Sequence, residues 1–202
     1  MMVMRMNISD FSSLIKNHCD DVQVICDADL TIINCSVKWP GSVHDARILR
    51  ESPLFDDFEG QSKPLSGFIL GDSGYMLRDW LLTPVMNPQT AKEQGYNEAH
   101  SVTRSTVERC IGVVKRRWHS LHGELCVAPE KACKIICACF ILHNRAVRLN
   151  HPVPELPDTL PPDLPTDDSS SGSCRPSEQA RVAAGKIARQ RLIDQFFWQT
   201  AT

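Results

Sequence analysis

The stretch SVTRSTVERCIGVVKRRWHSL, residues 101–121, decides the fold that we expect for this chain. Its apolar residues Val107, Ile111, Val114 and Trp118 recur every three or four positions, which is the spacing of one face of an α-helix. We expect a long helix here, with this face on a core and the charged residues toward solvent.

The segments on either side of this helix predict a mixed α/β fold. Residues 22–39 contain two β-branched runs around the turn Asp27-Ala28-Asp29, which is the pattern of a β-hairpin. Residues 67–71, GFILG, predict a short buried strand. Residues 129–149 begin with Pro and are broadly apolar, which predicts a buried helix. Between these segments we expect a short helix at 43–51, a polar loop up to residue 66, helical turns at 76–82 and a loop at 87–98.

The composition changes after residue 150. Residues 151–177 contain seven prolines and the run DDSSSGS, which predicts a disordered linker. The C-terminal residues have an amphipathic pattern that predicts a helix or tail. We therefore divide the chain into a divergent N-terminal segment, a main domain, a linker and a C-terminal segment, over residues 1–21, 22–149, 150–177 and 178–202.

The composition also excludes several classes of protein. The 202 residues are 42% hydrophobic and 23% charged, as in globular proteins. The sequence has no run of about 18 apolar residues, so we expect no membrane as a partner. The net charge of -2 conceals a division: residues 1–103 carry 8 basic and 14 acidic side chains, and residues 104–148 carry 9 and 3. This division indicates a cation-binding region beside a surface for a polyanion, although two solvated faces would give the same pattern.

Three carboxylates occupy positions that are typical of metal ligands. Asp72 follows the predicted strand, Glu108 lies on the long helix, and Asp45 lies at the start of the short helix. Oxygen ligands of this kind suit Mg²⁺ or Mn²⁺, and two such ions about 3.5–4 Å apart can activate water for phosphodiester cleavage. The same three acids could instead be surface groups or helix caps.

Four blocks of the sequence resemble one family. They are WPGSVHDARIL (39–49), ILGDSGYMLRDWLLTP (69–84), YNEAHSVTRSTVERCIGVVKRRW (96–118) and ILHN (141–144). Their order and spacing are similar to those of the Harbinger transposase-derived nucleases and the PIF/Harbinger transposases, over about residues 22–148. The resemblance implies an RNase H-like mixed sheet with flanking helices, and a DDE-type acidic site that binds divalent cations and acts on DNA phosphodiester bonds.

The resemblance also implies roles for individual residues. Asp72 matches the second acid of the triad, Glu108 matches its glutamate, and Asp45 matches a further acid associated with the metal. In the family the first acid lies on an opening strand at the centre of the sheet, and residues 1–20 contain no match to that strand. We therefore expect a sheet without its opening strand. Two functions stay open: a metal-dependent nuclease, and an inactive remnant that serves as a protein or DNA interaction module.

The resemblance implies DNA as a partner, a Myb-like DNA-binding protein as a second one, and a location in the nucleus, with the cytoplasm as a further place. Five basic residues on the long helix are candidates for phosphate contacts: Arg104, Arg109, Lys115, Arg116 and Arg117. They could equally form an ordinary solvated face. Zinc is not expected, because the cysteines near His143 lack the spacing of a structural zinc site.

Overall fold

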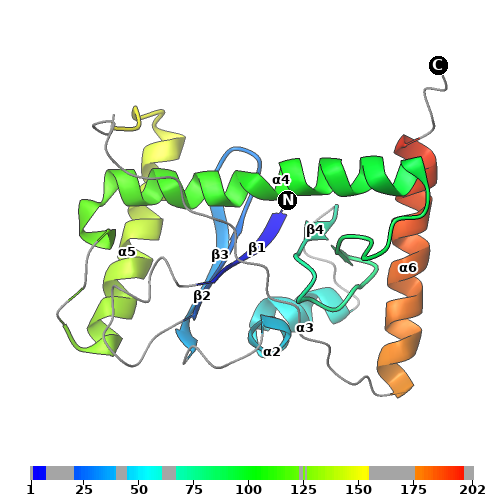
Figure 1. Ribbon diagram of the computed structural model, residues 1–202. Helices are drawn as coiled ribbons and strands as arrows, with labels where there is room; N and C mark the ends of the chain where they lie inside the picture. Colours follow the sequence, from blue (N-terminus) through cyan, green and yellow to red (C-terminus); the bar gives the residue numbers. More distant parts are fainter. Residues whose placement is uncertain are drawn as a thin grey trace.

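The sheet of this protein is organised around strand β2 (Asp21–Cys26). In the structure, which is a computed structural model, β2 pairs antiparallel with β1 (Met2–Asn7) on one side and with β3 (Ile32–Trp39) on the other (Figure 1). The β2–β3 turn is held by Asp27, whose Oδ1 accepts the backbone N–H groups of Asp29 and Thr31 at 3.0 and 2.8 Å. The predicted hairpin is therefore confirmed.

A second, smaller sheet contains β4 (Ile69–Leu70) and β5 (Leu81–Leu82), which run parallel. Strand β4 contacts β1, so the spatial order across both sheets is β3, β2, β1, β4, β5. The structure describes residues 2–7, 21–39, 45–60, 67–122, 125, 127–154 and 176–197. Within these residues, no helix is both long enough and apolar enough to cross a membrane.

We expected a sheet without an opening strand, and this prediction is wrong. Strand β1 precedes the hairpin and pairs with the edge of β2 that does not face β3. The β1 sequence, MVMRMN, has little of the β-branched content that marks a strand. Its register with β2, in which Met2 faces Cys26 and Asn7 faces Asp21, depends on a strand distant in sequence. The pattern of residues 1–20 alone could not predict such a pairing.

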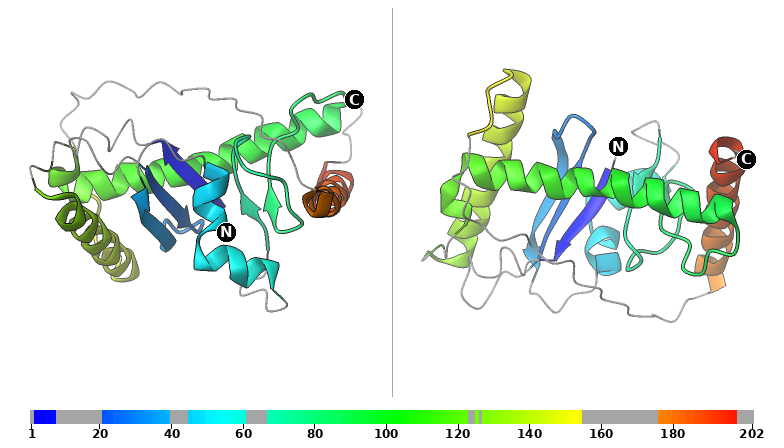
Figure 2. Two further views of the ribbon diagram at one scale, coloured as in Figure 1. Left: turned by 90° about the horizontal axis from the view of Figure 1, so that it is seen from below. Right: turned by 45° about the horizontal axis from the view of Figure 1, so that its top comes forward.

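The helices form two groups joined by one long helix. Figure 1 shows α4 crossing the whole molecule, with α5 beside one end and α6 beside the other, and Figure 2 shows the same arrangement from two further sides. The helices are α2 (Asp45–Arg50), α3 (Pro53–Glu59), α4 (Ala91–Arg117), α5 (Pro129–Arg148) and α6 (Pro176–Phe196), with a 3₁₀ turn η1 (His119–Leu121) after α4.

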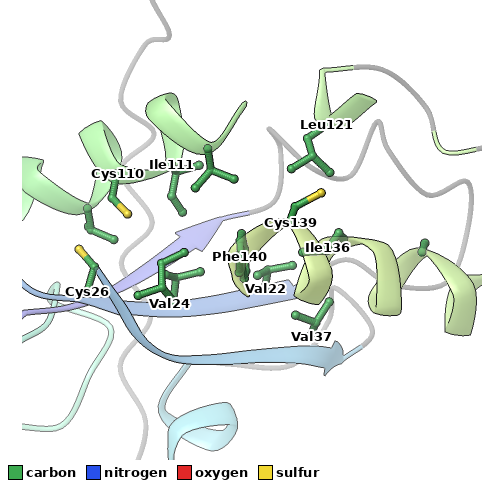
Figure 3. Packing of buried hydrophobic residues seen from close by; sticks show 14 residues of the cluster. Val22, Val24, Cys26, Val37, Cys110, Ile111, Leu121, Ile136, Cys139 and Phe140 are labelled. Carbon is green, nitrogen blue, oxygen red and sulfur yellow. The ribbon is translucent and has the colours of Figure 1, made fainter. Parts of the chain in front are cut away.

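Successive side chains of β2 enter two different cores, because a strand alternates its side chains between its two faces. Val22, Val24 and Cys26 join a first core with β3, α4 and α5 (Figure 3). Ile25 faces the other way, into a second core that contains Leu49, Phe58, Ile69 and Leu81. Trp80 closes this second core by stacking on Phe58, with ring centroids 4.9 Å apart. Strand β2 is thus buried on both faces.

The ILHN block fastens the hairpin to α5. The Asn144 side chain donates to Ile32 O at 2.7 Å and accepts from Ile32 N–H at 2.8 Å. His143 is fully buried, and its Nε2 donates to Leu30 O at 2.8 Å. Burial lowers the pKa of His143, so the neutral imidazole is favoured. Leu30, at a φ of 63°, lies in the left-handed region that branched residues rarely adopt, and these contacts hold it there.

Several local predictions are wrong. Residues 76–82 form a loop and β5 instead of helical turns, and residues 53–59 form α3 instead of a loop. Helix α4 begins at Ala91, ten residues before the predicted start, because Thr90 and Glu93 form a capping box. Helix α5 has the predicted extent, but one of its faces is exposed. The 150–177 linker lies mostly outside the described residues.

Helix α6 approaches the second core very closely. A Cβ placed on Gly185 would lie 2.8–2.9 Å from backbone atoms of Arg78, so only glycine fits. Arg78 is 3% exposed, and its guanidinium lies 3.2 Å from Glu59 of α3 and 2.7 Å from Glu178 of α6. Arg181 of α6 also pairs with Glu59. This ion-pair network joins α3, the segment before β5 and α6.

The close approach at Gly185 predicts a stability effect. Gly185→Ala should destabilise the protein by about 1–3 kcal/mol, because the added methyl group forces α6 away from Arg78. Gly112→Ala is the matched control: a Cβ there meets nothing within 4 Å, so this variant should be about 0.5–1 kcal/mol more stable. Urea unfolding measures both. Equal stabilisation by the two substitutions would show that α6 is not packed as described.

Candidate functional site

Asp72 lies in a tight turn directly after β4. Its Oδ1 accepts the Gly74 N–H at 2.8 Å, and its backbone oxygen accepts the Tyr75 N–H at 3.3 Å. A Cβ on Gly71 would lie 2.9 Å from the Tyr75 ring, so the turn can fold back only over a glycine. The Tyr75 hydroxyl accepts from Gln23 Nε2 of β2 at 2.9 Å. The GDSGY block is therefore a rigid turn that the central strand holds in place.

Helix α4 lies along the carboxyl ends of β4 and β5, the edge at which Asp72 stands. Tyr96 donates to Thr83 O at 3.0 Å, and the Asn97 side chain makes two hydrogen bonds to the Val85 backbone, each of 2.8 Å. Leu82 O accepts from Gly71 N–H at 2.9 Å and from His100 Nε2 at 3.2 Å. Gly71, directly before Asp72, and His100 of α4 thus donate hydrogen bonds to the same carbonyl oxygen.

His100 connects Asp72 to α4 electrostatically. Its side chain is buried, and this burial is the main cause that lowers the His100 pKa. The positive charge of Arg104 lowers the pKa further, whereas the negative charge of Asp72 raises it. Asp72 and Arg104 are therefore both within electrostatic range of the same imidazole.

Glu108 lies two turns beyond His100 on α4, about 12 Å along the helix axis. Its side chain is 54% exposed, and Oε1 lies 3.8 Å from Arg104 Nη2. An exposed pair of this kind contributes little to stability, so it leaves Glu108 available to another cation. Arg104 and Glu108 lie one turn apart on the same side of α4.

The third predicted ligand, Asp45, is the first residue of α2, and its side chain lies outside the described part of the structure. Among the described side chains, no three His, Cys, Asp or Glu residues gather as the ligands of one metal ion. Asp72 and Glu108 supply hard oxygen donors, which suit Mg²⁺ or Mn²⁺ better than softer metals. Of the three predicted ligands, the structure describes the side chains of Asp72 and Glu108.

The five basic residues lie on different sides of α4. At 100° per residue, Arg104 and Lys115 share the flank of Glu108, whereas Arg109 and Arg116 share another. Arg117 donates to His151 O at 2.7 Å and Pro152 O at 3.1 Å, so it fastens the segment after α5. The five residues form two basic surfaces and one structural contact.

Sequence reasoning missed four residues of this edge. Three of them, Tyr96, Asn97 and His100, stand on the first turns of α4, and the Thr90-x-x-Glu93 pattern of a capping box was the signal for this helix start. The fourth is Arg189 of α6, whose Nη1 donates to Thr83 O at 3.1 Å and Pro84 O at 2.9 Å. No local pattern places α6 beside this loop.

Comparison with known proteins places the chain in a family. The family model described as "DDE superfamily endonuclease" matches residues 3–144, which include Asp72, all of α4 and all of β1 except Met2. The chain therefore belongs to the DDE superfamily endonucleases.

Curated relatives narrow this class. The protein named "Putative nuclease HARBI1" is 35% identical over 176 residues in mouse and 36% identical over 177 residues in human, in each case over 86% of this chain and 49% of the relative. "Protein ALP1-like" of Arabidopsis thaliana is 30% identical over 143 residues, 64% of this chain and 35% of that protein. The resemblance to Harbinger-derived nucleases is confirmed. The chain spans about half the length of the HARBI1 relatives, and no solved structure matches it.

The prediction that Asp72 and Glu108 bind one cation can be tested by substituting each carboxylate. Asp72→Asn and Glu108→Gln should each weaken Mn²⁺ binding by at least about tenfold, because each removes a charged oxygen ligand. Glu98→Gln removes an exposed glutamate from the same helix but from another side, and it should change little. Isothermal titration calorimetry checks this. Three equal affinities would exclude a shared site.

Proposed function

We propose that this chain is an RNase H-like nuclease domain of transposase descent, which acts on DNA phosphodiester bonds with a divalent cation, Mg²⁺ or Mn²⁺. The observation that carries the proposal is the position of Asp72 in a rigid turn at the end of β4, beside α4, within residues 3–144 that match the endonuclease family. A strand-end carboxylate held by backbone contacts is pre-organised for metal chemistry.

The strand order supports the RNase H-like part of this proposal. Strand β1 lies between β2 and β4, at the central place that an opening strand has in that fold. The antiparallel strands β1, β2 and β3 come first in the chain, and the parallel pair β4 and β5 follows. Helix α4 then crosses the sheet and contacts both β1 and β2.

The proposed ligand set rests on the family motif, in which Asp72 and Glu108 match acids of the triad and Asp45 matches a further acid. Asp72 and Glu108 would hold the cation, and Asp45 would be an auxiliary ligand. A divalent ion in such a site activates water and stabilises the leaving oxygen of a phosphodiester. Arg104 pairs with Glu108 at 3.8 Å, and cation binding to Glu108 would release this guanidinium toward a DNA phosphate.

The DNA surface in this proposal extends along α4 from the carboxylates. Arg104 and Lys115 are on the flank of Glu108 and would contact phosphates nearest the cation, and Arg109 and Arg116 would contact a neighbouring stretch of backbone. A nuclear location, and a separate Myb-like protein that supplies sequence-specific DNA binding, belong to the same proposal, because the Harbinger resemblance implies both.

A second candidate function is an inactive remnant that serves as a protein or DNA interaction module. The observation that favours it is the sequence of β1, MVMRMN, which contains no acidic residue at the place where the family carries the first acid of its triad. A pair of metal ions normally needs a carboxylate that bridges them.

Duplex binding in the presence and absence of cation tests the DNA function. We expect the chain to bind a short labelled duplex more tightly with Mn²⁺ than with EDTA, because the ion offsets repulsion between the carboxylates and the phosphates. Asp72→Asn should remove this difference, and Glu98→Gln should keep it. Fluorescence anisotropy at fixed ionic strength measures both. Failure to bind the duplex under either condition would contradict a DNA function.

Cleavage distinguishes the two candidate functions. The nuclease function predicts nicking of supercoiled plasmid with Mg²⁺ or Mn²⁺, whereas the inactive remnant predicts none. For this chain alone we expect little or no nicking, since β1 lacks the acid that would complete the site. Gel electrophoresis of the plasmid checks this, with EDTA as the control. Robust nicking that disappears in Asp72→Asn would contradict the expectation and would show a complete active site in this chain.

A further inference from the structure

Helix α5 has two apolar faces, of which only one is covered. The inner face buries Ile136 and Phe140 in the first core (Figure 3). On the outer face, Ile141 is 69% exposed, Leu142 48% and Leu149 54%. Figure 2 shows α5 at the edge of the molecule in both views, with none of the described helices or strands over its outer side. Exposed apolar side chains gathered in this way mark an interaction surface.

The outer face of α5 is also basic. Lys131 and Lys134 lie toward its first turns, and Arg145 and Arg148 lie toward its last turn, so the cations flank the apolar residues at both ends. All four are on the exposed side of the helix, and no ion pair joins them to the acidic groups of the described residues. Glu130 is the one acidic residue of α5.

The apolar and basic residues form one continuous strip. Ile141, Arg145, Arg148 and Leu149 are spaced i, i+4, i+7 and i+8, which places them on one side of the helix. Together with Asn144 they line a hollow on the surface. A strip with this spacing matches the anchors by which two amphipathic helices pack.

We propose that the outer face of α5 binds an amphipathic helix of a partner protein, with leucine-type residues on the partner's apolar face and aspartate or glutamate beside them. The partner's apolar side chains would cover Ile141 and Leu149, and its carboxylates would face Lys134, Arg145 and Arg148. This surface is separate from the α4 flank, so the proposal goes beyond the nuclease function.

Charge and polarity favour this occupant over two others. A second copy of α5 would bring lysine and arginine against lysine and arginine in either orientation, which costs free energy. Duplex DNA would satisfy the cations but would leave Ile141 and Leu149 against a charged backbone, without apolar contact. An acidic amphipathic helix satisfies both kinds of residue on the strip.

The test uses the full chain and a fluorescein-labelled synthetic peptide of three heptads, with Leu at the a and d positions and Glu at the e and g positions. We expect saturable binding by fluorescence anisotropy. Ile141→Glu combined with Leu149→Glu should weaken binding by at least about tenfold, and so should Arg145→Glu combined with Arg148→Glu. Ile187→Glu, at an isoleucine of α6 that is 55% exposed, is the matched control and should bind like the wild type.

Two measurements keep the test specific. A peptide with Lys in place of Glu should bind at least about tenfold more weakly than the acidic peptide, because its charges would repel α5. Thermal unfolding should be unchanged in all three variants, since the substituted side chains are exposed.

Three results would overturn the proposal. The first is equal binding of the acidic peptide to the wild type and to the Ile141/Leu149 variant, or no binding to either. The second is a dimer in light scattering that Ile141→Glu dissociates, which would assign the face to a second copy. The third is binding of a labelled duplex that is lost only in the Arg145/Arg148 variant and that the peptide does not compete away, because this result would assign the face to DNA.

Discussion

The structure depends on one constraint: strand β2 must be buried on both faces. Its alternating side chains enter two cores, so the hairpin needs α4 and α5 on one side and α2, α3, β4 and β5 on the other. A strand of this kind also needs partners at both edges, which β1 and β3 provide. Each half of the molecule is thus tied to the same six residues.

The candidate site is a consequence of this constraint. In the sequence of β2, Gln23 stands between two residues that face the first core, so its own side chain points to the other face. There its amide donates to the Tyr75 hydroxyl and fixes the turn that carries Asp72. The first core holds the body of α4, and the hydrogen bond from His100 to Leu82 O holds its earlier turns beside the segment that follows β5. Asp72 and Arg104 both act on the His100 imidazole, and Glu108 pairs with Arg104. The packing of α4 on the sheet therefore positions both Glu108 and the basic residues of this helix.

The sequence predicts those parts of the fold in which the local pattern and the tertiary packing agree. The hairpin at 22–39, the strand before Asp72 and the body of α4 have clear periodicity, and all three are present. Strand β1 and the start of α4 were missed for different reasons. Residues 2–7 become a strand only through pairing with β2, whereas the Thr90 capping box was a local signal that the polar composition of 87–98 concealed.

The candidate site divides in the same way. Asp72 and Glu108 could be chosen from their positions and the family blocks, but His100 and Arg189 could not, because their roles depend on contacts with Leu82 and Thr83 that are remote in sequence. The apolar run of α5 predicted a buried helix, whereas the structure buries only one of its faces. In a domain of this size one face of that helix has no core left to enter.

The central claim is that Asp72 and Glu108 share one divalent cation beside α4. Anomalous diffraction from crystals grown with Mn²⁺ tests it most directly. The claim predicts one strong peak, with a carboxylate oxygen of Asp72 and one of Glu108 about 2.0–2.6 Å from the ion. A peak elsewhere, or a separation of the two Cα atoms beyond roughly 15 Å with no ion between them, would contradict it, because carboxylates bind metals only at short range.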